Sequence, residues 1–236
     1  MSAELSVVIL CYRAGERTYS FVEKITKLLN RFVLSWEIIL VANYFEDTGD
    51  KTPEIAKEIS SKNENIRVVA MPKEGMMGWD ARSGLNEAKG KYICLIDGDE
   101  QMPYRDIVRV YRKIKSGTLD FVKTYRVIRH DGILRLIISF IYNLLFALLF
   151  PGIEMKDANS KPKIFKREAY NKMLLKSDDW FLDAEIMIQA RRLKFKIGQI
   201  PTKFYKCNYR DSFVKGNTLF EFIKNLFFAR IEEFFK

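Results

Sequence analysis

Residues 91–101, KYICLIDGDEQ, form a short and almost wholly apolar run that ends in the polar turn DGDEQ at 97–101. Such a run is typical of a strand that is buried on both faces of a parallel sheet. Three similar runs precede it, namely LSVVILC at 5–11, EIILVAN at 37–43 and IRVVAM at 66–71. The sequence therefore predicts four interior strands in its first hundred residues.

Helical patterns separate these strands. Residues 17–34, 52–62 and 79–89 carry the apolar spacing or the terminal residues of helices, with Thr52-Pro53 at one start and Gly90 after one end. Strand and helix alternate about every thirty residues, which predicts an α/β fold with a doubly wound, mostly parallel sheet and helices on both faces. The second half is expected to add helices at 104–116, 168–175 and 181–194 and strands at 120–126 and 162–167.

Composition and charge limit the function. A chain of 236 residues, 48% of them apolar, can bury a large core, which excludes a disordered tail or a disulfide-stapled miniprotein. Residues 1–118 hold 18 basic and 17 acidic side chains, whereas residues 119–236 hold 22 and 13. The second half therefore favours an anionic partner, and nucleic acid, lipid headgroups and phosphorylated small molecules are all candidates.

Cysteine, histidine and the apolar segments indicate the compartment and the metal. Three scattered cysteines and a start without a basic leader favour a reduced, cytoplasmic protein. His130 is the only histidine, so a metal site would use oxygen ligands, which favours Mg²⁺ or Mn²⁺ over zinc. The uncharged run at 136–150 would reach only ~22 Å as a helix, short of a hydrocarbon core of ~30 Å.

The turn after the fourth strand is the strongest candidate site. Ligands of open α/β sheets bind at the carboxyl ends of the strands. Asp97 and Asp99 stand there with a glycine between them, and Gln101 adds an amide oxygen. These groups suit one divalent cation, although a solvated turn would carry similar residues.

These residues resemble the family 2 glycosyltransferases with the GT-A fold, and within them the dolichyl-phosphate and polyprenyl-phosphate sugar synthases. SVVILCYR at 6–13 is similar to the first strand of that branch, S-V-V-I-P-T-Y-N-E, and DGDEQ is similar to its metal motif D-A-D-L-Q. GMMGW at 75–79 and AKGKYI at 88–93 resemble the family's segments before that motif. The resemblance covers about residues 5–215.

The resemblance implies the roles of individual residues. It implies catalytic roles for Asp97, Asp99 and Asp183. It implies contacts to the nucleotide sugar from Tyr12, Asn43, Asp97, Gly98, Arg126, Arg210 and Lys215. It implies contacts to the acceptor from Arg129, Ser160 and Asp183. It implies Mg²⁺ or Mn²⁺ bound by Asp97, Asp99 and Gln101.

One departure concerns the nucleobase. The second strand of the family ends V-D-D-G-S-x-D, whereas this sequence reads Val41-Ala42-Asn43 and continues with Tyr44 and Phe45. Asn43 can hydrogen-bond a base edge and an aromatic ring can stack on it. The exchange of carboxylate for amide leaves GDP-linked and UDP-linked donors both open.

The function implied is inverting transfer of a hexose from a nucleoside diphosphate sugar to dolichyl or polyprenyl phosphate, with mannose from GDP-mannose first and glucose from UDP-glucose next. A phosphate acceptor is already an anion, whereas a sugar hydroxyl, the alternative acceptor, needs Asp183 as a base. A sugar nucleotidyltransferase would show a glycine-rich basic loop after the first strand, which residues 11–15 lack. A non-enzymatic basic module that binds membrane or nucleic acid is the remaining alternative, but no nucleic-acid motif accompanies the charge, and we expect no nucleic-acid partner.

The two apolar segments suggest a location. On a helix, Arg135, Ser139 and Asn143 form a narrow polar stripe, and residues 218–236 contain six phenylalanines among basic side chains. Such segments lie at a lipid surface, in a core or against a second copy, and the oligomeric state stays open. We expect a catalytic domain at 1–212, with a nucleotide half at 1–101 and an acceptor half at 102–212. We expect a membrane-associating helix at 213–236 on the cytoplasmic face.

Overall fold

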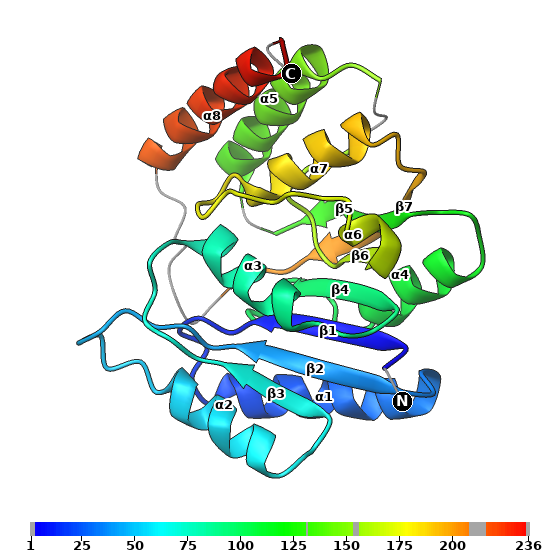
Figure 1. Cartoon of the computed structure of the whole chain (residues 1–236). Coiled ribbons are helices and arrows are strands. Elements are labelled where there is room, and N and C mark those ends of the chain that lie inside the picture. The colour runs from blue at the N-terminus through cyan, green and yellow to red at the C-terminus, as the bar shows by residue number, and fades with distance from the viewer. Residues whose placement is uncertain (1–2, 131, 153–155, 208–215, 235–236) are drawn as a thin grey trace.

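The computed structural model describes residues 3–130, 132–152, 156–207 and 216–234. A seven-stranded sheet runs through the molecule in the order β3-β2-β1-β4-β6-β5-β7 (Figure 1). The strands are β1 (Leu5–Leu10), β2 (Trp36–Val41), β3 (Ile66–Val69), β4 (Tyr92–Asp97), β5 (Phe121–Arg129), β6 (Lys163–Lys166) and β7 (Ile197–Phe204). Only β6 runs antiparallel to its neighbours, so the predicted mostly parallel α/β fold is confirmed.

Helices cover both faces of the sheet. The helices are α1 (Arg17–Phe32), α2 (Thr52–Ser61), α3 (Met77–Glu87), α4 (Asp106–Lys115), α5 (Ile133–Leu149), α6 (Arg167–Tyr170), α7 (Leu182–Arg192) and α8 (Gly216–Phe234). One apolar core lies between the sheet and α1, α2 and α4, and a second lies between the sheet and α3, α5 and α7. Strand β1 serves both cores, because Val7 and Ile9 point to the first and Val8 to the second.

The glycine of helix α3 allows that helix to lie close to the sheet. A Cβ atom at Gly84 would come within 2.4 Å of Val41 Cγ2 and 2.6 Å of Val8 Cγ1. Since van der Waals contact needs well over 3 Å, no larger side chain fits there without a shift of the helix. Close packing at Gly84 therefore sets the height of α3 above β1 and β2.

One strand of the second half was missed, and one expectation was wrong. Strand β7 was not predicted, since its eight residues include a glycine, a proline and exposed polar side chains. The helix expected at 168–175 ends at Tyr170. The chain beyond it bonds to α7 instead: the side chain of Gln189 pairs with both backbone groups of Leu174, and Glu185 accepts from the Lys176 and Ser177 amides.

The register of β6 matters for the site. Strand β6 pairs antiparallel with β4, and Lys163 lies opposite Leu95. The same register continued by two residues brings Lys161 level with Asp97, the last residue of β4. A lysine from the second half of the chain therefore reaches the carboxyl end of a central strand.

Helices α5 and α8 lie side by side at one end of the molecule, beyond the sheet (Figure 1). Tyr142 and Phe146 of α5 are buried, as is Leu226 of α8, so both helices pack partly on the protein. Of the helices that the structure describes, none combines the length and the apolar character needed to cross a membrane.

Candidate functional site

The turn after β4 forms the floor of the site. The backbone N–H of Gly98 donates to Leu10 O at the end of β1, 2.8 Å away, and a Cβ atom at Gly98 would lie 2.9 Å from that oxygen. Only glycine lets the turn lie this close to β1. Asp97, Asp99 and Gln101 are therefore presented together at the strand ends, each partly exposed.

Gln101 ties this turn to the end of β7. Its Nε2 donates to Tyr205 O at 3.0 Å, and its own carbonyl accepts from the Tyr205 N–H at 2.8 Å. Glu100 turns away and pairs with Lys24 of α1 at 2.9 Å. The segment that follows β7 is therefore anchored at this turn. The predicted Arg210 and Lys215 come later in that segment and lie outside the described residues.

The donor set of this turn fits a hard divalent cation. Asp97, Asp99 and Gln101 offer two carboxylates and one amide oxygen within five residues. In the part of the chain that the structure describes, no cluster of three or more His, Cys, Asp or Glu side chains could hold a metal. Mg²⁺ and Mn²⁺ are commonly bound by one or two carboxylates, with water and substrate phosphate as further ligands, and this turn can supply that number.

Asp183 lies on the other side of the site, in the first turn of α7. Lys161 Nζ is 2.9 Å from one of its carboxylate oxygens and Lys163 Nζ is 2.6 Å from the other. The aspartate is 3% exposed. Burial alone would raise the pKa of Asp183, but the two ammonium groups outweigh it and hold the pKa below its usual value.

Lys161 also reaches the metal turn. Its Nζ lies 3.3 Å from Asp97 Oδ2, so one ammonium group contacts Asp97 and Asp183 together. Burial lowers the pKa of Lys161, yet the charges of the two aspartates more than compensate and keep the pKa above its usual range. The structure thus brings together two predicted residues, Asp97 and Asp183, through a lysine that was not predicted.

One sequence signal could have identified these lysines. Alternation along a strand places Lys163 on the same face as Phe165, which is buried against Phe121 with ring centroids 4.6 Å apart. A lysine on a buried face needs a carboxylate partner. The sequence could therefore predict that Lys163 has such a partner, although not which aspartate it is.

The predicted acceptor side contains a second buried ion pair. Arg126 Nε and Nη2 lie 2.6 and 2.8 Å from the two carboxylate oxygens of Asp157. Burial would raise the pKa of Asp157, but the guanidinium keeps it well below its usual range. Ser160 is fully buried and shares a hydrogen bond of 2.7 Å with Thr124. Arg126, predicted to contact the nucleotide sugar, is therefore held by Asp157, and Ser160, predicted to contact the acceptor, faces the protein interior. The guanidinium groups of Arg126 and of the predicted acceptor residue Arg129 both lie over the ring of Phe204 at the end of β7.

The predicted nucleobase residue Asn43 does not face the site. It is fully buried at the end of β2. Its Nδ2 donates to Asp80 Oδ1 and Ser83 Oγ at 3.0 and 3.1 Å, and its Oδ1 accepts from the Met71 N–H at 3.1 Å. Because these bonds engage both ends of the amide, Asn43 holds α3 and β3 in place and is not positioned to contact a base.

The space next to Asn43 is closed by a lysine and two aromatic rings. Lys73 Nζ forms a short ion pair with Asp80 and lies 4.5 Å from the ring centroid of Tyr12 and 5.7 Å from that of Phe45. The two rings meet edge to face, 6.0 Å apart. Burial lowers the pKa of Lys73 and raises that of Asp80. Tyr12, for which the resemblance implies a contact to the nucleotide sugar, therefore lies against Lys73 and Phe45, two residues beyond the end of β1.

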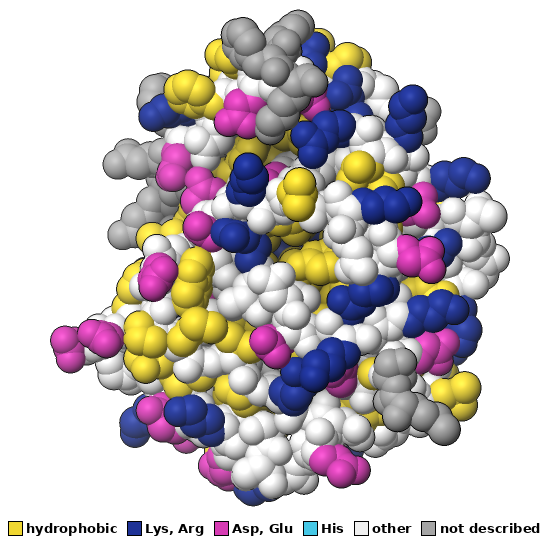
Figure 2. Space-filling model, viewed as in Figure 1, with side chains coloured by type: hydrophobic (Ala, Val, Ile, Leu, Met, Phe, Trp, Pro, Cys, Tyr) yellow, Lys and Arg dark blue, Asp and Glu magenta, His cyan; other side chains and the backbone are white. Residues whose placement is uncertain are grey.

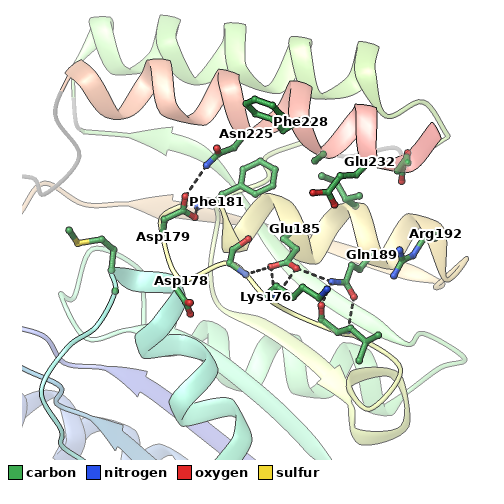
Figure 3. A pocket seen from close by; sticks show the side chains of 17 residues that line it. Lys176, Asp178, Asp179, Phe181, Glu185, Gln189, Arg192, Asn225, Phe228 and Glu232 are labelled. Atoms are coloured by element: carbon green, nitrogen blue, oxygen red, sulfur yellow. Dashed lines mark hydrogen bonds between the residues drawn. The ribbon is translucent and has the colours of Figure 1, made fainter. Parts of the chain in front are cut away.

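A pocket of about 790 Å³ between α7 and α8 is a separate feature (Figure 3). None of the predicted site residues that the structure describes lines it. Its acidic side chains serve the protein: Glu185 accepts from the backbone of Lys176 and Ser177, and Asp179 accepts from Asn225 Nδ2 at 2.8 Å. This pocket is therefore distinct from the site at the strand ends.

Helices α5 and α8 expose many large apolar side chains. On α5, Asn143 turns inward, donates to Ser139 O and accepts from the Ala158 N–H at 3.0 Å. Large apolar side chains between 46% and 71% exposed are Leu136, Ile137, Phe140, Ile141, Leu144 and Leu148 on α5 and Phe227, Phe228 and Ile231 on α8. The charged Arg135, Glu221, Lys224 and Glu232 of these helices are exposed as well, and Phe228 also lines the pocket. Figure 2 shows Lys and Arg side chains over both halves of the face in view, with Asp and Glu side chains among them.

Comparison with known proteins agrees with this architecture. The family model described as "Glycosyl transferase family 2" matches residues 6–179. A dolichyl-phosphate beta-glucosyltransferase from Dictyostelium discoideum is 28% identical over 83% of this chain, and a dolichol-phosphate mannosyltransferase from Pyrococcus furiosus is 26% identical over 95%. The matches span 64% and 63% of those two relatives, so the chain covers less than two thirds of their length.

A solved structure supports the fold. Glucosyl-3-phosphoglycerate synthase from Mycobacterium tuberculosis, crystallised with Mn²⁺, UDP and phosphoglyceric acid, superimposes with a TM-score of 0.71 at 18% identity. The match covers 97% of this chain and 78% of that one. At this identity the likeness shows the fold alone, and it confirms the predicted GT-A architecture.

Proposed function

Because this chain belongs to glycosyl transferase family 2, we propose that it transfers a hexose, with inversion, from a nucleoside diphosphate sugar to dolichyl or polyprenyl phosphate. The catalytic unit proposed is 1–212, with the nucleotide bound by the first hundred residues and the acceptor by those that follow. Residues 213–236 are proposed as a membrane-associating segment.

The state of Asp183 is the observation that carries the choice of acceptor. Both of its carboxylate oxygens accept from buried ammonium groups, and its pKa is lowered. A carboxylate in this state is a weak base, and taking a proton would leave two lysines with less compensation. A sugar hydroxyl needs a base, whereas a phosphate monoester with a second pKa of about 6 is an anion at neutral pH. The site therefore favours a phosphate acceptor.

The donor side would neutralise the leaving diphosphate. We propose that Asp97, Asp99 and Gln101 hold Mg²⁺ or Mn²⁺, which when bound would stabilise negative charge on the leaving group. The predicted Arg210 and Lys215 follow the segment that Gln101 anchors at Tyr205, so they are proposed to act on the same diphosphate. Tyr12 is proposed to contact the nucleoside.

The sugar is proposed as glucose or mannose. Two dolichyl-phosphate beta-glucosyltransferases, from Dictyostelium discoideum and Saccharomyces cerevisiae, and one dolichol-phosphate mannosyltransferase are among the relatives. Because Asn43 is directed inward, it gives no basis for choosing between the two bases. UDP-glucose and GDP-mannose are therefore the two donors to compare.

The apolar face of α5 and α8 supports a membrane location. Helix α5 turns its polar Asn143 toward Ala158 and exposes Phe140, Leu144 and Leu148, which is the reverse of a helix that faces water. Residues 119–236 carry 22 basic and 13 acidic side chains, and this net positive charge would attract anionic headgroups. We propose peripheral attachment to the cytoplasmic face of a membrane, where the lipid acceptor would be presented.

A transfer assay with matched acceptors tests the reaction. Purified protein is incubated with Mn²⁺, radiolabelled UDP-glucose or GDP-mannose, and a short polyprenyl phosphate. The polyprenol without its phosphate is the control acceptor. We expect label in the lipid only with the phosphate and a loss of transfer in Asp99→Asn. Equal labelling of the alcohol, or transfer only to glycan hydroxyls, would overturn the proposed acceptor.

A further inference from the structure

One buried ammonium group joins the two halves of the site. Lys161 Nζ contacts Asp97 of β4 at 3.3 Å and Asp183 of α7 at 2.9 Å. The side chain of Lys161 is 4% exposed, so water cannot replace these partners. The resemblance implied no role for this lysine.

The two aspartates depend on Lys161 to different degrees. Asp183 keeps a second ammonium partner, Lys163, whose Nζ lies 2.6 Å away. Asp97 contacts Lys161 but is 32% exposed in its side chain and opens toward the site. A change at Lys161 therefore alters the charge beside Asp97 more than it alters the pairing of Asp183.

We propose that Lys161 is a positioning residue that competes with the divalent cation for Asp97. The inference rests on the proposed function, because it takes Asp97 as a metal ligand. The Lys161 ammonium that contacts Asp97 Oδ2 repels an approaching divalent cation and offsets part of the negative charge of Asp97. In the free protein both effects weaken cation binding. A nucleoside diphosphate brings negative charge that offsets this repulsion. Lys161 would thus make cation binding depend on the donor nucleotide.

Lys163 provides a matched control. It is as deeply buried as Lys161 and bonds the same Asp183, but no contact with Asp97 is seen for it in the described structure. If charge beside Asp97 is what matters, removal of Lys163 should leave the affinity for the cation unchanged. If any loss of a buried lysine loosened the site, both removals would act alike.

Titration of the free protein with Mn²⁺ tests the competition, with unbound Mn²⁺ measured by electron paramagnetic resonance. We expect K161M and K161Q to bind Mn²⁺ about tenfold more tightly than the wild type, with K163M and K161R unchanged. Thermal melting of each variant establishes that it is folded. Two neutral variants are compared because the ends of the Met and Gln side chains differ in shape and polarity, so an effect that both share reflects the loss of charge. Unchanged or weaker Mn²⁺ binding in the folded neutral variants, or equal tightening in K163M, would overturn the inference.

Repeating the titration with UDP and GDP separates this inference from the proposed function. In the wild type, either nucleotide should tighten Mn²⁺ binding, and that gain should shrink in K161M. If neither nucleotide binds with Mn²⁺ to the wild type, the proposed function fails whatever the lysine variants do. If the nucleotide gain is present in the wild type and equally large in K161M, the proposed function stands and the role of Lys161 is refuted.

Discussion

Replacing Asp183 by Asn removes one negative charge from a site where two lysines are buried. Lys161 Nζ and Lys163 Nζ lie 2.9 and 2.6 Å from the two carboxylate oxygens, and the three side chains are at most 4% exposed. Removing one partner of a buried ion pair costs about 3–5 kcal/mol, because an uncompensated charge stays in the protein. We expect D183N to lower the free energy of unfolding at pH 7 by about this amount.

Urea denaturation of D183N, K163M and the double variant measures this cost and its cause. The double variant lacks both Asp183 and the Lys163 ammonium that D183N alone would leave with one partner fewer. Its loss of stability should therefore be smaller than the sum of the two single losses by about 0.5–3 kcal/mol. A loss below about 1 kcal/mol in D183N would mean that the lysines are compensated in another way, and would refute the reasoning from these distances.

The same variant tests the role of Asp183 in transfer. At a temperature well below its melting point, D183N should keep its turnover with a polyprenyl phosphate within about tenfold of the wild type, because that acceptor needs no base. A general base contributes about 10²–10⁴-fold. A fall of that size in protein shown to be folded would make Asp183 the base and would favour the hydroxyl acceptor.

Three other substitutions test a buried charge, a close contact and the apolar face. Burial lowers the pKa of Lys123 to about 7, so above pH 7 the unfolded chain binds more protons than the folded protein does. From pH 7 to 10 the free energy of unfolding of the wild type should therefore rise relative to that of Lys123→Met. A constant difference would contradict this. Gly84→Ala should cost about 1–3 kcal/mol in a denaturant titration, whereas Gly117→Ala, which meets nothing within 4 Å, should not; equal effects would refute the packing argument. Phe140→Ser should reduce sedimentation of the protein with anionic vesicles and leave its stability nearly unchanged. Leu34→Ser, at a residue that is 95% exposed, is the control. Unchanged sedimentation, or light scattering that shows a wild-type dimer and a Phe140→Ser monomer, would assign this face to another role.

Local pattern was enough to predict the first half of the fold. The four strand runs appear as β1 to β4, and the three helices between them as α1 to α3, because an interior strand and its crossover helix are each encoded by a few neighbouring residues. The polar turn from Asp97 to Gln101 was predicted at a strand end for the same reason, and it lies there.

The second half depended on pairings between distant residues. Strand β7 alternates weakly and becomes a strand because β5 pairs with it along its whole length. The segment after Tyr170 was expected to be helical, but its backbone bonds to the side chains of Glu185 and Gln189 on α7. Such hydrogen bonds join residues that no local window contains, so periodicity could not reveal them.

The sequence by itself determined the fold class, the family and the residue types at the metal turn, since these follow from short motifs. Only the tertiary structure decided how the charged groups are paired. It directs Asn43 inward to Asp80, closes Arg126 on Asp157, and brings Lys161 between Asp97 and Asp183. The physical reason is that a buried charge needs a partner, and which partner it finds is set by an antiparallel register between β4 and β6 that joins residues more than sixty positions apart.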